Sequence, residues 1–456
     1  MSQFNMRKQA ISQWKVLVAV LSLFLTVLIW QKGLQESFDR PSVSPRISLN
    51  QHEIALLAQP ALPVNVETVF VGTSPKNTLK ELLMEIPINN ISDREKLLLA
   101  LLDDSKDIRP SLVAASIKDN EFQLIREQIL ESLDENGVAS SLSSLASLKR
   151  DPLIYALSCG AVGGRSGDCV DNRVSQSMAL RLVASQLIPI FATFLGISLC
   201  LRQGWLLVRK RNRIWPTITP LPLSIIDMVL LVAGGFVVLG EVITPLVAIP
   251  ISQVLTNGIA SPIKESVNVL IGYSSMTVPP LIIFRQQLKV VSSLQMPLGG
   301  WIQWGLKPLN ESFLQALHGW LLVLPFVLLI SWLMTSLIGD PGGSNPLLEL
   351  VLGSNNFFAL GILFLTTVVL APLFEEFIFR GALLPVLVQK QGRVLGVLIS
   401  ALVFALAHLS IGELPPLIVL GVGLALLRLS SGRLFPCVVM HSLWNGITFV
   451  NLLLLA

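Results

Sequence analysis

Two adjacent glutamates and an arginine lie inside a strongly apolar stretch, Phe374-Glu375-Glu376-Phe377-Ile378-Phe379-Arg380. A charge near the bilayer centre costs roughly 2.5–3.5 kcal/mol on insertion scales, so such charges usually face a bundle interior or a wet cavity. Glu376 and Arg380 are four residues apart and share a helix face, so they can form an ion pair. Glu375 points about 100° away and has no cation on its own face. The spacing predicts one structurally neutralised carboxylate beside one that is free for chemistry.

Two later apolar runs carry the other ionisable groups. One contains Phe404-Ala-Leu-Ala-His408, and the other contains His441 and Asn445, which are four apart and therefore project from one helix face. At ~1.5 Å per helical residue, Glu375 and His408 lie about 22 Å from the nearest basic turns, His441 about 12 Å and Asn445 about 18 Å. These depths allow the four groups to converge in the middle to outer part of a membrane.

The residue types define the chemistry that such a cluster allows. An unpaired carboxylate can take a proton from water. Neutral imidazoles can hold a divalent metal or donate to a developing oxyanion. Glu375, His408 and His441 also match the ligand types of a catalytic Zn²⁺ site with one position left for water. Both arrangements predict hydrolysis of an amide bond inside the membrane.

Each residue also has a purely structural interpretation. A single intramembrane histidine more often forms a structural hydrogen bond between helices, and Asn445 can connect two helices in the same way. The joint pattern on three successive helices favours a site. The string Gly164-Arg165-Ser166-Gly167 matches rhomboid serine proteases, but it lies in a polar loop and is interpreted as a coincidence.

The three motifs together resemble the CPBP family of intramembrane proteases, also called the CAAX-protease and bacteriocin-processing family. Its pattern of EExxxR, FxxxH and HxxxN or HxxxD stands here complete and in order, at 375–380, 404–408 and 441–445. The resemblance covers residues 357–456 and implies an all-helical membrane bundle of about eight spans.

The resemblance also implies roles for the motif residues. By analogy, Glu375 activates water, and His408 is its catalytic partner or a metal ligand. His441 and Asn445 would stabilise the oxyanion, while the second glutamate and the arginine of the first motif support these groups. Zn²⁺ dependence and a metal-independent glutamate mechanism both stay open. Eukaryotic relatives cleave prenylated CaaX C-termini.

Composition places the chain in a membrane. Of 456 residues, 52% are hydrophobic and only 14% are charged, whereas soluble domains carry about 25% charged residues. The net charge of +4 follows from basic cytoplasmic loops, and no nucleic-acid-binding motif occurs. The lipid bilayer is therefore the expected surrounding.

Hydropathy and charge divide the chain into three parts. Residues 1–30 form an uncleaved signal anchor with a cytoplasmic N-terminus, although a cleaved signal peptide is the alternative. Residues 31–177 form an extracytoplasmic, mainly helical region with a Pro-rich linker. Leucines and isoleucines recur there at three- and four-residue intervals over 79–85, 94–102 and 120–133, which predicts amphipathic helices. Residues 178–456 form eight apolar spans, and basic clusters follow every second span of the chain. The resemblance implies that these eight spans make up the intramembrane protease domain. The fold class is all-α, with about nine spans at roughly 16–30, 178–201, 225–251, 266–284, 319–338, 357–388, 394–409, 414–427 and 434–455.

The cysteines follow this division. Cys159 and Cys169 flank a Gly-rich loop and can pair if that region is extracytoplasmic; two unpaired thiols are the alternative. Cys200 and Cys437 lie in apolar runs and are expected to be buried and inert.

The sequence thus predicts an intramembrane peptidase that acts on a membrane-embedded or membrane-proximal protein or peptide. The architecture and loop usage favour a bacterial source, of cyanobacterial type, and a cell or thylakoid membrane, where prenylated substrates are not expected. The alternatives are a non-catalytic membrane scaffold or immunity-type protein that retains the fold, and a transporter with Glu375 in a proton relay. Nothing in the sequence indicates the oligomeric state.

Overall fold

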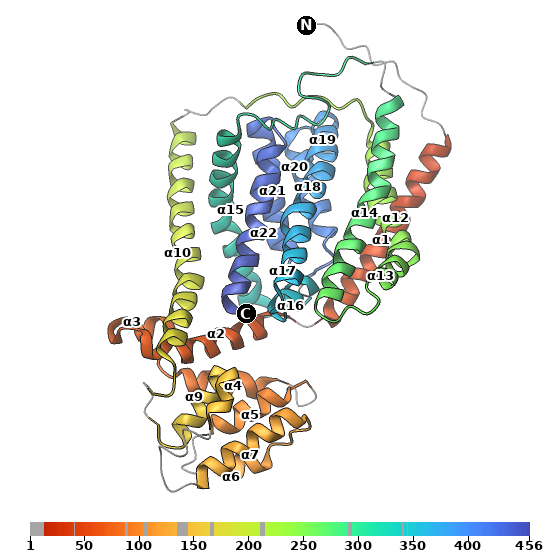
Figure 1. The fold of residues 1–456 in the computed structure, drawn as a ribbon. Helices are drawn as coiled ribbons and strands as arrows, with labels where there is room; N and C mark the ends of the chain where they lie inside the picture. Colours follow the sequence, from red (N-terminus) through yellow and green to blue (C-terminus); the bar gives the residue numbers. More distant parts are fainter. Residues whose placement is uncertain are drawn as a thin grey trace. The chain divides into compact units, whose positions relative to one another are not determined.

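The computed structural model describes residues 13–40, 42–86, 90–103, 108–134, 145–164, 168–209, 215–290, 294–339, 342–343 and 345–456. Every regular element within these residues is a helix, which confirms the all-α prediction (Figure 1). The chain forms two compact units. The membrane unit is Met1–Val43 with Phe191–Val450, and the small unit is Ser44–Ile190 with Asn451–Ala456.

The small unit consists of short helices. They are α2 (Ser44–Ala58), η1 (Gln59–Ala61), α3 (Val64–Val71), α4 (Pro75–Glu85), α5 (Asp93–Leu101), α6 (Arg109–Ala114), α7 (Asn120–Asp134), η2 (Leu145–Arg150), α9 (Pro152–Ala161) and the beginning of α10 (Asn172–Val208). The periodicity of leucines and isoleucines predicts α4, α5 and α7, and the structure confirms these three helices. Their apolar faces meet in one core, which includes Leu79, Leu98 and Ile129, all fully buried.

Helix α5 illustrates how local sequence determines where a helix of this unit begins and which helices it contacts. Ser92 is its N-cap, and a reciprocal pair of bonds with Glu95 forms a capping box. Arg94 on the same helix donates two hydrogen bonds of 2.9 Å to Glu53 of α2 and one of 2.6 Å to Asp151, the N-cap of α9. One guanidinium therefore connects three helices.

Cys159 and Cys169 form a disulfide, as the extracytoplasmic interpretation of this loop expects. A side chain at Gly164 would collide with both sulfur atoms, because a Cβ there would lie 2.5 and 2.6 Å from them. The other three residues of the rhomboid-like string, 165–167, lie outside the described residues.

The membrane unit contains the long helices. They are α1 (Gln13–Asp39), the remainder of α10, a continuous run of α11 (Ile225–Val229), η3 (Leu230–Val238), α12 (Leu239–Ile243), η4 (Thr244–Ala248) and α13 (Ile249–Leu255), then α14 (Ile263–Val290), α15 (Leu309–Ile338), α16 (Pro346–Leu352), α20 (Arg393–Leu406), α21 (Leu414–Ser431) and most of α22 (Phe435–Leu455). A second continuous run consists of α17 (Phe357–Phe364), η5 (Leu365–Leu370), α18 (Ala371–Glu376), η6 (Phe377–Leu383) and α19 (Leu384–Gln391).

Eight helices in the described part of the chain are long and apolar enough to cross a membrane. The chain is therefore an integral, multi-pass membrane protein. The predicted span at 394–409 corresponds to α20, a 14-residue apolar helix that is shorter than these eight. Apolar side chains remain exposed along the long helices, for example Phe191 and Phe194 of α10, each 66% exposed. Lipid is the solvent that such faces require.

The glutamate-bearing run is continuous over 35 residues from Phe357 to Gln391. Its length exceeds a straight span, and Pro372 is predicted to kink it or to mark the start of the charged helix. In the structure Pro372 lies in the first turn of α18, directly after the π-helical segment η5. A second π-helical segment, η6, follows Glu376. Such wide turns are frequent at functional sites.

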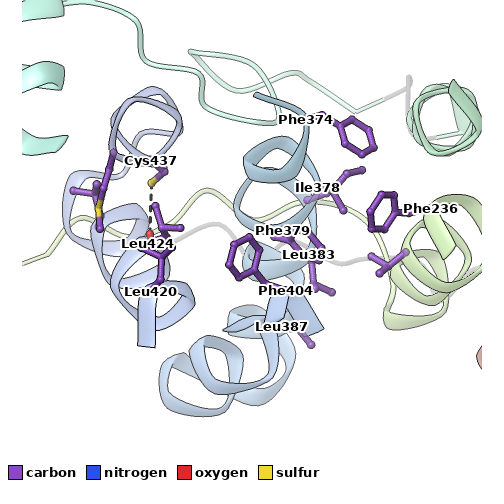
Figure 2. Close-up of a cluster of buried hydrophobic side chains, with 14 of the residues drawn as sticks. Phe236, Phe374, Ile378, Phe379, Leu383, Leu387, Phe404, Leu420, Leu424 and Cys437 are labelled. Carbon is purple, nitrogen blue, oxygen red and sulfur yellow. Dashed lines mark hydrogen bonds between the residues drawn. The ribbon is translucent and has the colours of Figure 1, made fainter. Parts of the chain in front are cut away.

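Aromatic and aliphatic side chains pack around this run (Figure 2). The Phe379 and Phe404 rings meet edge to face with centroids 5.4 Å apart, and Phe236 contacts Phe374 at 5.7 Å. Cys437 is fully buried and donates to the Leu424 carbonyl at 3.6 Å. This confirms that Cys437 is buried, as its apolar run predicts. The core therefore holds the charged run rigidly against α20, α21 and α22.

Candidate active site

The second glutamate of the EE pair is completely buried and makes its contacts through one oxygen, because Oε2 has no hydrogen-bond partner among the described residues. Glu376 Oε1 accepts from Arg380 at 2.8 Å and lies 3.0 Å from His441 Nδ1. Glu376 and Arg380 both have 0% exposed side chains. The structure thus forms the ion pair that the i,i+4 spacing predicts. Because a buried charge without its partner is very unfavourable, this pair is a structural unit.

Arg380 extends this unit to two further helices. Its guanidinium donates to the Gly421 carbonyl of α21 at 3.1 Å and lies 4.2 Å from the centroid of the Phe404 ring of α20. The cation–π contact explains why an aromatic residue suits the first position of the FxxxH motif. Arg428 of α21 in turn donates to the Arg380 carbonyl at 3.2 Å.

His441 is oriented by the buried carboxylate. Its side chain is 3% exposed and its Nδ1 faces Glu376. An ionised carboxylate can only accept, so Nδ1 carries the proton and the neutral ring presents a lone pair at Nε2. That Nε2 lies 3.9 Å from Glu375 Oε2. A carboxylate behind a histidine in this way fixes both its tautomer and its ring plane.

His408 reaches the same atom from another element. Its Nδ1 lies 2.8 Å from the Phe404 carbonyl oxygen, which can only accept. The neutral His408 ring therefore also presents a lone pair at Nε2, which lies 3.8 Å from Glu375 Oε2. The sequence suggests that His408 lies on the span, but α20 ends at Leu406 and His408 lies in the turn that follows.

Glu375 lies between the two imidazoles. Its side chain is 14% exposed, and Oε2 is buried with no hydrogen-bond partner among the described residues. One carboxylate oxygen and two imidazole lone pairs thus face one another with no hydrogen between them. A proton, a water molecule or a cation is what this arrangement is built to receive.

Tyr273 of α14 is a residue of this site that the sequence did not indicate. Its hydroxyl lies 3.3 Å from Glu375 Oε1 and 3.3 Å from the Ala371 carbonyl oxygen, so it can donate to either. A signal existed, because the chain has only two tyrosines and one of them lies within a predicted span. Buried tyrosine hydroxyls usually have a hydrogen-bond partner.

Asn445 makes its contact one turn further along α22. Its Nδ2 donates to the Thr367 carbonyl oxygen of η5 at 2.8 Å. This bond connects α22 to the glutamate-bearing run. One amide N–H is used in this way, and an asparagine amide has two.

The donor types at Glu375, His408 and His441 suit zinc, which would polarise a carbonyl group and acidify bound water. No group of three His, Cys, Asp or Glu side chains in the described ranges is arranged to hold a metal ion as it stands. The side chains themselves supply a base and hydrogen-bonding groups for hydrolysis.

Fold and site together define a multi-pass helical membrane protein in which a glutamate and two histidines converge inside the bundle. Residues 357–447 match the family described as Type II CAAX prenyl endopeptidase Rce1-like. The matched range includes all three motifs and supports a CAAX-type, or CPBP, protease domain in this part of the chain.

Residues 44–180 match a second family, described as Domain of unknown function (DUF8675). This match covers most of the small unit and assigns it no activity. A search of the curated proteins found no match to the chain, and a search of the solved structures found none either.

Proposed function

We propose that this protein is an intramembrane peptidase that hydrolyses a peptide bond in a membrane-embedded or membrane-proximal protein, with Glu375 as the base that activates water. One observation carries the proposal. Glu375 Oε2 has no hydrogen-bond partner among the described residues and lies 3.8 Å from His408 Nε2 and 3.9 Å from His441 Nε2. A scaffold would need the buried Glu376–Arg380 pair but not a second, unsatisfied acid beside it.

In the first step a water proton moves to Glu375, and the water oxygen forms a bond to the scissile carbonyl carbon. The electron pair of the carbonyl moves onto its oxygen. His408 orients the water by accepting its other hydrogen at Nε2, which is the lone pair that the Phe404 contact leaves available. General-base catalysis of this kind contributes about 10²–10⁴-fold to a rate.

In the second step the carbon–nitrogen bond breaks, and the leaving amine takes the proton from Glu375. The oxyanion needs donors before this point. His441 lies between two carboxylates, at 3.0 Å from Glu376 and 3.9 Å from Glu375. We assign the oxyanion to the second amide N–H of Asn445, one turn further along α22, while the neutral His441 ring keeps the orientation that Glu376 gives it.

The substrate class follows from where the site lies. A membrane-embedded protease meets substrates within or beside the bilayer. The matched family is described by its action on CAAX prenyl proteins, so a farnesylated CaaX peptide is the first probe and its unprenylated counterpart the second. Our proposal is that an unidentified bacterial membrane peptide, not a prenylated one, is the physiological substrate. We also propose that the small unit lies outside the cytoplasm and that the N-terminus of the chain lies in the cytoplasm.

The test compares terminal peptides of membranes that carry wild type, Glu375→Gln, His408→Ala and the matched control Glu241→Gln. Glu241 is a glutamate of the membrane unit that has no assigned role. We expect one or more cleavage products to disappear in the first two variants and to remain in the control. Unchanged products in both site variants would exclude the peptidase and favour the scaffold.

The Glu375→Gln variant also provides a substrate trap, because it removes the base and leaves the cavity nearly unchanged in shape. Zinc content of purified, active wild type addresses the mechanism separately. About one zinc per chain would favour Glu375, His408 and His441 as ligands, whereas an active sample without metal would favour the glutamate mechanism.

A further inference from the structure

His408 is held by a loop and not by a helix. It lies two residues beyond α20, in the turn of residues 407–413 that leads into α21. The next residue, Leu409, has a positive φ of 50°. A bulky residue persists in this left-handed conformation only where its surroundings impose it. The position of the His408 ring therefore depends on whatever holds this loop.

The end of α1 makes two of the hydrogen bonds that hold it. Arg40, directly after α1, donates from its guanidinium to the Leu409 carbonyl oxygen. Ser37, fully buried in the last turns of α1, accepts from the Ile411 backbone N–H at 3.0 Å. The first contact is to the residue that follows His408, and the second is to the third residue after His408.

Close packing adds to these bonds. Gly33 of α1 faces the Leu409 side chain so closely that a Cβ at position 33 would lie 2.9 Å from Leu409 Cδ1. Ser410 is 1% exposed and donates to the Gly343 carbonyl oxygen at 2.6 Å. Gly343 in turn donates its N–H to the Arg40 carbonyl oxygen at 2.9 Å. Leu409, Ser410 and Ile411 are thus each fixed by α1 or by a residue bonded to it.

The rest of α1 packs against the membrane unit along one face. Its buried residues Ala19, Ser22 and Thr26 recur at three- and four-residue intervals, and Gly33 and Ser37 continue the same spacing. Thr26 donates to the Ala233 carbonyl oxygen of η3 at 3.2 Å. A Cβ at Gly234 would lie 3.1 Å from Ser22 Oγ. These contacts give α1 a fixed depth and rotation, so its end presents Ser37 and Arg40 in a defined place.

We infer that the C-terminal end of α1 positions His408 for catalysis, with Arg40 and Ser37 as positioning residues. This inference rests on the proposed function, because His408 matters only if the site is catalytic. It assigns α1 a part in the active site although α1 lies far outside the range 357–447 that matches the protease family. An α1 removed as a signal peptide would leave the loop after His408 without these contacts.

The test uses the full-length protein with Arg40→Ala, Arg40→Lys, Ser37→Ala and the control Lys32→Ala. Lys32 lies on the same helix, is 79% exposed and pairs only with the exposed Glu36 in the described residues. The activity-independent readout is amide hydrogen exchange over residues 407–413. We expect faster exchange in Arg40→Ala and Ser37→Ala, wild-type exchange in Lys32→Ala, and partial recovery in Arg40→Lys, because lysine keeps a donor.

Cleavage-product yield is the second readout. A displacement of about 1 Å can lower a rate about 10²-fold, so we expect a 10–10²-fold loss in Arg40→Ala and a smaller loss in Arg40→Lys. Wild-type exchange and yield in Arg40→Ala would overturn the inference, and so would faster exchange with an unchanged yield. If Glu375→Gln also leaves the yield unchanged, the proposed function has failed, whereas the exchange data still report whether α1 holds the loop.

Discussion

Helix α5 of the small unit and the α18–η6 segment of the membrane unit each carry clustered charges. The charged side chains of the two segments differ in how completely they are paired. In α5, Asp93 accepts from Lys96 and from the backbone amides of Lys118 and Asp119. Arg94 binds two carboxylates. In α18–η6, Glu376 has Arg380 and His441, whereas Glu375 Oε2 has no hydrogen-bond partner among the described residues.

The difference separates charges that hold a fold from a charge kept for chemistry. Water reaches the α5 network, where the Arg94 side chain is 32% exposed, so leaving a partner unpaired there would cost little. The membrane unit has 0% exposure at Glu376 and Arg380, so an unsatisfied acid nearby is expensive. Glu375 and Glu376 each have one buried oxygen without a hydrogen-bond partner among the described residues. Glu375 is distinguished because it has no arginine or lysine partner among those residues and instead faces two imidazoles.

Arg380→Met should have the largest effect on stability. It leaves Glu376 buried without its cation, and breaking a buried pair costs about 3–5 kcal/mol. We expect loss of folded protein in a thermal unfolding assay in detergent. The double variant Glu376→Gln with Arg380→Met removes both charges and should recover much of that stability. A double variant as unstable as the single one would show that packing, and not charge, dominates.

Tyr273→Phe should affect rate and not stability. It removes only the hydroxyl that lies 3.3 Å from Glu375 Oε1, so we expect about a tenfold lower product yield, which corresponds to about 1.4 kcal/mol. Unfolding should remain at the wild-type temperature. Tyr155→Phe in the small unit is the matched control. A wild-type yield in Tyr273→Phe would remove this hydroxyl from the site.

Arg94→Met should destabilise the small unit by about 1 kcal/mol, because its ion pairs are partly exposed and screened. The pKa of Arg94 is raised by its hydrogen bonds to Glu53 and Asp151, although burial opposes this. Limited proteolysis of the small unit should quicken, while cleavage by the membrane unit stays unchanged. An effect as large as that of Arg380→Met would mean that the two networks are equivalent.

Asp93→Asn should have the smallest effect, and its signature is a changed pH dependence in acid. The Lys96 side chain, followed by the amides of Asp119 and Lys118, lowers the pKa of Asp93 from 3.8 to about 2. A lowered pKa gives stability that is present above the unfolded value and is lost as pH falls through the folded value. The wild type should therefore lose resistance to proteolysis between pH 4 and pH 2 more steeply than Asp93→Asn. Parallel curves would contradict the assignment.

Much of this could be predicted from the sequence, because helices obey local rules. Four-residue spacing predicts the Glu376–Arg380 pair, and leucine periodicity predicts α4, α5 and α7. The approach of His408 and His441 to Glu375 follows from similar depths on neighbouring elements.

Other features depend on contacts that spacing does not encode. Tyr273 is 102 positions away from Glu375 in the sequence, and no periodicity connects the two. The FxxxH spacing holds for His408, but the end of α20 at Leu406 depends on the left-handed Leu409 and on the loop contacts with α1. Pro372 lies inside the continuous run, directly after the π-helical segment η5, and such local widening is one way in which a membrane helix accommodates a proline.

The wide helical turn after the glutamates changes how many residues share one side of the helix. In a π turn the fifth residue, as well as the fourth, stands above the first. Arg380 and Gly381 thus both follow Glu376 onto the crowded side, and a Cβ at Gly381 would lie 3.6 Å from the Glu376 carbonyl oxygen and 2.9 Å from Ile302. Because the arginine side chain already occupies this side of the helix, the next position has space only for a residue without a side chain. The geometry therefore favours the string EExxxRG.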